Sequence, residues 1–86
     1  EATSLDTYAW VLFKKGEYAK ARDYIDTALA NDKEGPSEEL LHHAGDIYFM
    51  AGDPDKAVEF WTEALKLDPD NELLKRKVTH KTYFYK

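Results

Sequence analysis

Three residues whose side chains can bind metals or transfer protons could meet on helical surfaces: His42, Asp46 and His80. His42 and Asp46 stand one helical turn apart, and His80 could approach them from a later helix. A zinc site needs three or four such ligands. Because the sequence has no His-x₃-His pair and no cysteine, it predicts that no metal is bound.

Asp6 and Asp46 could also face one groove, as two carboxylates must in an enzyme that transfers a glycosyl group. The other signs of a catalytic site are missing. The sequence has no serine or threonine in a strained nucleophile turn and no glycine-rich loop for phosphate. We therefore predict that the protein is not an enzyme and uses no cofactor.

The length and composition indicate one small folded domain. A chain of 86 residues is close to the lower limit for burying a self-sufficient core, and its apolar fraction of 43% is ordinary for a globular protein. No apolar run is long enough for a membrane span, and the lack of cysteine excludes disulfide bonds. The chain starts at Glu1, close to a predicted helix, so we interpret it as a piece of a longer protein.

The charge is unevenly distributed, with a formal net charge of −5. All 17 acidic residues lie within residues 1–72, so this part lacks the basic footprint of a nucleic-acid-binding protein. Residues 73–86 carry only basic charges, which we interpret as a solvated helix face. Contact with an acidic partner is the alternative. The basic residues are Lys75, Arg76, Lys77, Lys81 and Lys86.

Apolar and small residues recur with helical spacing in four consecutive segments, and strand signals are absent, so the sequence predicts an all-α chain. Each segment follows the pattern i, i+3, i+4, i+7, i+8, which forms one stripe along a helix. The stripes are Leu5, Tyr8, Ala9, Leu12 and Phe13; Ala21, Tyr24, Ile25, Ala28 and Leu29; Leu41, Ala44, Gly45, Tyr48 and Phe49; and Ala57, Phe60, Trp61, Ala64 and Leu65.

Turn-forming residues separate these stripes. Gly16 and Gly52 are expected to end helices, and Ser37 and Asp53 are expected to cap the starts of the helices that follow them. Every loop is short, so consecutive helices should be antiparallel neighbours. A weaker stripe predicts a fifth helix over about residues 72–84, formed by Leu74, Val78, Thr82 and Tyr85.

The first helix pair is repeated by the second, because Gly16 aligns with Gly52 and Ala21 with Ala57. This helix–turn–helix unit resembles the tetratricopeptide repeat, which has about 34 residues and the pattern W-x₂-L-G-x₂-Y…A-x₃-F…P. The second unit shows Leu41-x₂-Ala44-Gly45-x₂-Tyr48, then Ala57-x₃-Trp61, Ala64 and Pro69. The first unit shows Leu5-x₂-Tyr8-Ala9-x₂-Leu12, then Ala21-x₃-Ile25 and Ala28, with Lys33 in place of the proline.

The resemblance implies a right-handed helical-hairpin solenoid. Its parts would be one repeat over residues 2–35, a second over 38–71, and a capping helix with a basic aromatic tail over 72–86. Small residues would let the helices of a hairpin approach closely. Large residues would fill the space between hairpins: Tyr8, Tyr24, Ile25, Tyr48, Phe60 and Trp61.

The resemblance also implies a binding face, because the first helix of each hairpin in this family lines a concave surface that holds an extended peptide or a helix. Two rows would form there, one aromatic and one mixed. A carboxylate clamp made from lysine and asparagine is not expected, because Asp6 and Trp10 occupy those positions. The predicted peptide-binding residues are Asp6, Trp10, Phe13, His42, Asp46, Phe49, Arg76, His80 and Tyr83. Of these, Phe13, Phe49 and Tyr83 would form the aromatic row, and Trp10, Asp46 and His80 the mixed row.

The sequence thus predicts a protein–protein interaction module that binds a peptide or a partner helix. Two alternatives stay open: a structural cap at the C-terminal end of a longer solenoid, or a self-association element that forms a homodimer. A further resemblance, to the C-terminal repeats of longer bacterial tetratricopeptide proteins, implies a parent protein in the cell envelope, either periplasmic or lipid-anchored.

Overall fold

The computed structural model of the chain describes residues 2–31 and 35–83. Within them the chain forms helices and no strand, which confirms the all-α prediction. The helices are α1 (Ala2–Lys14), α2 (Tyr18–Asn31), α3 (Glu38–Met50), α4 (Pro54–Leu67) and α5 (Glu72–His80). Three residues named in the sequence predictions, Lys33, Tyr85 and Lys86, lie outside the described residues.

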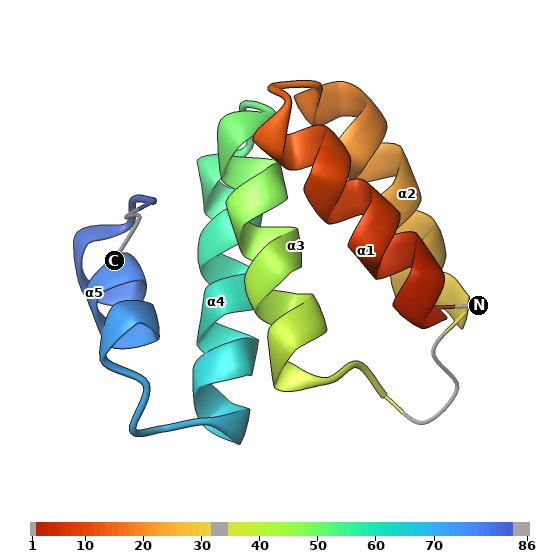
Figure 1. Cartoon of the computed structure of the whole chain (residues 1–86). Coiled ribbons are helices and arrows are strands. Elements are labelled where there is room, and N and C mark those ends of the chain that lie inside the picture. Colours follow the sequence, from red (N-terminus) through yellow and green to blue (C-terminus); the bar gives the residue numbers. More distant parts are fainter. Residues whose placement is uncertain (1, 32–34, 84–86) are drawn as a thin grey trace.

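Figure 1 shows α1 and α2 at one end of the fold, α3 and α4 in the middle and α5 at the other end. α1 packs against α2 and α3 against α4, and each pair is a helical hairpin joined by a short turn. The hairpins are then joined by packing of α2 on α3, and α5 packs on α4 at the far end. This succession of hairpins is the predicted helical-hairpin solenoid.

The two hairpins match residue for residue. Gly16 and Gly52 follow the ends of α1 and α3 with φ angles of +83° and +99°, a left-handed conformation that glycine adopts without steric cost. In each turn, the residue after this glycine donates its N–H to a carbonyl in the last turns of the helix. These bonds join Glu17 to Leu12 and Asp53 to Tyr48, both at 2.9 Å. Each position of α1 therefore has a defined equivalent in α3.

The predicted N-caps are confirmed. The Ser37 hydroxyl accepts the backbone N–H of Leu40 at the start of α3, at 3.1 Å. The Asp53 carboxylate accepts the backbone N–H of Lys56 at 3.2 Å, and Pro54 occupies the first position of α4, where no N–H is needed. These caps fix where the two helices of the second hairpin begin.

The fifth helix is shorter than the sequence predicts. It begins after Asn71, whose side chain accepts the N–H of Leu74 at 3.0 Å, but it ends at His80 rather than near residue 84. The cause is Lys81, which adopts a left-handed backbone with φ of +55°. The following residue, Thr82, then donates its N–H back to the Lys77 carbonyl at 3.2 Å. This turn directs Tyr83 back toward the helices.

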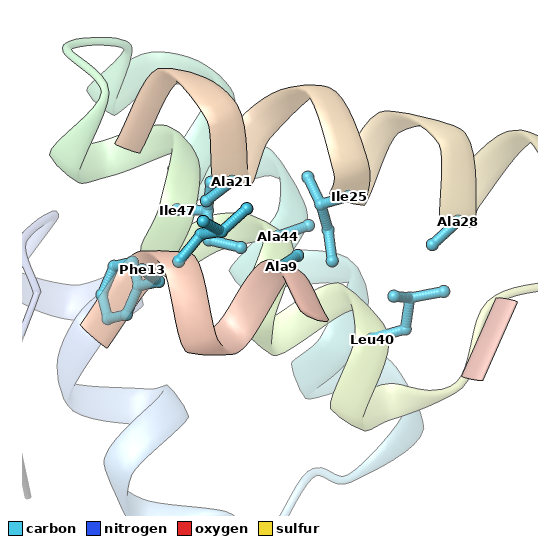
Figure 2. Close-up of a cluster of buried hydrophobic side chains, with 9 residues drawn as sticks. Ala9, Phe13, Ala21, Ile25, Ala28, Leu40, Ala44 and Ile47 are labelled. Atoms are coloured by element: carbon cyan, nitrogen blue, oxygen red, sulfur yellow. The ribbon is translucent and has the colours of Figure 1, made fainter. Parts of the chain in front are cut away.

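Two buried clusters form the core. The first joins α1, α2 and α3, and Figure 2 shows its side chains meeting between these three helices. The second joins α3, α4 and α5 around Trp61, which is fully buried. The first cluster contains Ala9, Leu12, Phe13, Ala21, Ile25, Ala28, Leu40, Ala44 and Ile47, and the second contains Leu41, Ala57, Trp61, Ala64 and Leu74.

One packing prediction is wrong. Tyr8 does not fill the space between hairpins, because it is 51% exposed and lies edge-on against Tyr24 of its own hairpin, with ring centroids 4.7 Å apart. The space between α2 and α3 is filled by Ile25, as predicted, together with smaller side chains, including Ala44 and Ile47.

Gly45 allows α3 and α4 to approach each other. A Cβ atom at this position would overlap the Cδ1 and Nε1 atoms of the Trp61 indole. Gly45→Ala gains about 1 kcal/mol in helix propensity, but overpacking of a rigid ring costs about 1–3 kcal/mol. We expect the second effect to dominate, so that Gly45→Ala lowers the midpoint of thermal unfolding measured by circular dichroism. A midpoint above that of the wild type would contradict this packing.

Candidate peptide-binding face

The first helices of the two hairpins and α5 together line one hollow. It has a volume of about 170 Å³, which is enough for one side chain of a partner. Alternate helices of the fold meet here although they are distant in the sequence. We call this space the central hollow. Its lining residues are Trp10 and Lys14 from α1; His42, His43 and Asp46 from α3; and Leu73, Lys77 and Tyr83 from α5 and the segment after it.

The floor of the central hollow is a buried polar network centred on Lys77. This side chain donates to an Asp46 carboxylate oxygen at 2.7 Å and to His42 Nε2 at 2.6 Å. The same Asp46 oxygen also accepts the indole N–H of Trp61 at 3.0 Å. Lys77 is only 1% exposed, so the prediction that the basic residues of α5 form a solvated face is wrong for this residue.

Aromatic rings surround the Lys77 ammonium group as well. It lies 4.9 Å from the centre of the Tyr83 ring and 5.7 Å from that of Trp61. Such cation–π contacts favour the charged form of the lysine. The network therefore ties α5 to both helices of the second hairpin.

Burial shifts the protonation equilibria of the network. It raises the pKa of Asp46 and lowers the pKa of Lys77, while the charge of each partner acts in the opposite direction. Burial, followed by the charges of Lys77 and His43, lowers the pKa of His42 to about 4. His42 is consequently neutral at pH 7, and its Nε2 lone pair can accept the Lys77 hydrogen bond.

The low pKa of His42 predicts a loss of stability in mild acid. In the unfolded chain this histidine titrates near 6.5, so between about pH 6.5 and 4 the unfolded state binds a proton that the folded state does not. The free energy of unfolding therefore falls as the pH falls. At pH 5, the titration of His42 should lower it by about 2 kcal/mol. The measurement is urea unfolding at pH values between 7.5 and 5.

The control is a variant that cannot titrate. His42→Gln keeps an oxygen that can accept the Lys77 hydrogen bond, and its stability should change less than that of the wild type over this pH range. Asp46 and Glu38, whose raised pKa values act in the opposite sense, are present in both proteins and cancel in the comparison. Equal pH dependence in the two proteins would contradict the assignment to His42.

The wall of the hollow is a stack of rings on α1 and α3. The Trp10 ring lies parallel to His43 at 4.1 Å and to Phe13 at 4.6 Å between centroids. The His43 ring is positioned by a hydrogen bond with Asp6, whose carboxylate lies 2.9 Å from Nδ1. The Lys14 ammonium group lies 5.6 Å from the centre of the Trp10 ring at the rim. The wall thus combines an aromatic surface with one exposed cation.

The structure places the predicted site residues in three groups. Trp10, His42, Asp46 and Tyr83 line the central hollow, and Asp6 supports it through His43. Phe13 and Phe49 are mainly packing residues, because Phe13 is buried beside Trp10 and Tyr83, and Phe49 packs on Trp61. Arg76 and His80 are exposed on α5 and are not among the residues that line the hollow.

The predicted rows are therefore only partly assembled. In the aromatic row, the rings of Phe13 and Tyr83 meet with centroids 5.7 Å apart, while Phe49 turns toward α4. In the mixed row, Asp46 is buried in the ion pair with Lys77 and is not available at the surface. His42 Nε2 lies 3.9 Å from the other oxygen of the buried Asp46 carboxylate.

Four residues that line the hollow are not among the predicted site residues: Lys14, His43, Leu73 and Lys77. A signal existed for Lys77, because it stands at helical spacing between Leu74 and Val78, on the apolar stripe of α5. The pairing of His43 with Asp6 had no local signal, because the two residues come from different hairpins.

The described residues contain no group of three or more histidine, cysteine, aspartate or glutamate side chains that could hold a metal ion. In the same parts of the chain, no helix has both the length and the apolar character required to cross a membrane.

Residues 38–71 match the family model of the tetratricopeptide repeat, and this range covers α3, α4 and the turn that leads to α5. Neither a curated protein nor a solved structure matches the chain significantly.

Proposed function

We propose, from the premise that residues 38–71 are a tetratricopeptide repeat, that this chain holds an extended peptide or a partner helix on the face made by α1, α3 and α5. Repeats of this type generally mediate protein–protein interaction, through the extended surface that stacked hairpins create. The proposal adds the location of the contact, with the central hollow at its middle.

The observation that supports this location is the convergence of three helices on one hollow. Trp10 and Tyr83 offer ring surfaces that are only partly buried, and Lys14 is exposed at the rim. Aromatic residues that are accessible in a hollow are typical anchors for a partner side chain. The polar groups of the floor already bond to one another, so an apolar or aromatic side chain could enter without leaving them unpaired.

Selection from a random-peptide phage library tests this function. The immobilised chain should retain peptides that share a common apolar or aromatic residue, and Trp10→Ala should abolish their binding. The matched control is Val11→Ala, the adjacent position on α1, which is not among the residues that line the hollow. Peptides that bind both variants equally well would contradict the proposed face.

A second candidate function is the structural cap of a helical array. The observation in its favour is the exposed outer side of α5, which presents polar and charged residues suited to water rather than to another helix. These residues are Glu72, Lys75, Arg76, Thr79 and His80. A library selection that yields no specific peptide would favour this function.

A further inference from the structure

The central hollow continues into a longer depression that reaches the turn end of the molecule, where Figure 1 shows the turns of both hairpins. We propose that the partner is an extended peptide with two apolar or aromatic residues about three positions apart and an acidic residue between them. This inference rests on the proposed function and adds the chemistry of the peptide that the site selects.

Three neighbouring hollows share lining residues and so form one depression, which we call the trough. The central hollow shares Lys14 and Tyr83 with a second hollow of about 160 Å³. The second hollow shares Tyr18 and Met50 with a third, of about 480 Å³, which lies against the first turn and the start of α2. A peptide that leaves the central hollow can therefore follow the trough to the turn end.

The third hollow has the character of a second apolar subsite. Met50 is 37% exposed there, and Tyr18 and Ala51 are partly buried beside it. The flexible methionine side chain can adapt to apolar and aromatic groups of different shapes. The two charged residues of this hollow, Glu17 and Lys20, pair with each other at 3.2 Å. An apolar side chain could thus enter without leaving either charge unpaired.

The length of the trough sets the spacing of the two apolar residues. Trp10 lines one end and Gly16 the other, and they are six residues apart in the sequence. This separation corresponds to about 9 Å along a helix axis. An extended peptide advances about 3.3 Å per residue, so its two apolar residues should be about three positions apart.

Lys14 provides the preference for an acidic residue. It lies between the two ends of the trough, is exposed, and forms no ion pair within residues 2–31 and 35–83. The other lysine of the central hollow, Lys77, is already paired with Asp46. A carboxylate between the two apolar residues of the peptide would therefore meet an available cation.

Selection from a displayed library of random peptides of about 12 residues, which is longer than the trough, tests the predicted motif. The strongest peptide is then synthesised, and its dissociation constant is measured with each variant by isothermal titration calorimetry. Met50→Glu should weaken binding about tenfold or more, because it places a charge in the second apolar subsite. The matched control is Leu67→Glu. Leu67 is also the last residue of its helix, is 60% exposed and lies outside the trough.

Reversal of the charge at Lys14 tests the acidic residue of the motif. Lys14→Glu should weaken binding of the selected peptide about tenfold, and replacement of the acidic residue of the peptide by lysine should restore it. Lys15→Glu changes the adjacent exposed lysine, which does not line the trough, and should alter the dissociation constant by less than about twofold.

The outcomes separate this inference from the proposed function. A peptide that requires Trp10 but binds Met50→Glu as tightly as the wild type would overturn the inference and leave the proposed function intact. A selection that yields no peptide, or peptides that Trp10→Ala does not affect, would overturn both. Sedimentation of the chain as a dimer that Met50→Glu converts to a monomer would also overturn the inference, because a second copy would then occupy the trough.

Discussion

Replacement of Lys77 by methionine should lower the free energy of unfolding by about 3–5 kcal/mol, which is a large share of the stability of a small domain. The substitution keeps the length and apolar stem of the side chain but removes the ammonium group from Asp46. Asp46 is 3% exposed, so its carboxylate would stay buried without the counter-charge. Urea unfolding followed by far-ultraviolet circular dichroism measures the loss.

Two further variants separate loss of the ion pair from a general weakening of α5. Lys75→Met changes an exposed lysine of the same helix and should alter the stability by no more than about 0.5 kcal/mol. Asp46→Leu combined with Lys77→Met removes both charges and should recover much of the loss, because no buried charge is then left unpaired. A double variant as unstable as Lys77→Met alone would refute this explanation.

The buried lysine also shows where sequence reasoning reaches its limit. The hairpins, the glycine turns at Gly16 and Gly52 and the caps at Ser37 and Asp53 could be predicted, because each depends on the chemistry of residues close together in the chain. Lys77 lies on an apolar stripe, yet lysine is rarely buried without a partner. Its partners, His42 and Asp46, come from a helix far away in the sequence.

The candidate face was predicted only in part for the same reason. Trp10, His42, Asp46 and Tyr83 were placed on the face by the family resemblance, and the structure brings them to one hollow. The resemblance does not state which side chains the neighbouring helices bury. The left-handed turn at Lys81 shortens α5, and Tyr83 then packs against Phe13. That contact depends on the path of the chain after the helix, which the apolar pattern does not specify.

Truncation of Trp61 to alanine should lower the free energy of unfolding by about 3–5 kcal/mol. The indole is fully buried in the cluster that joins α3, α4 and α5, so its removal leaves a cavity at the point where these helices meet. It also removes one of the two hydrogen bonds to the buried Asp46 oxygen. Trp10→Ala removes the same number of atoms from a partly exposed position and should cost less when measured by the same urea unfolding.

The first hairpin provides the specific test of why this tryptophan needs a glycine opposite it. Ala9 and Ile25 are fully buried at the positions equivalent to Gly45 and Trp61. An alanine therefore packs well where the facing side chain is isoleucine. In a Trp61→Ile background, Gly45→Ala should cease to be destabilising and should gain about 1 kcal/mol from helix propensity. If Gly45→Ala costs the same with tryptophan and with isoleucine at position 61, the indole is not what requires the glycine.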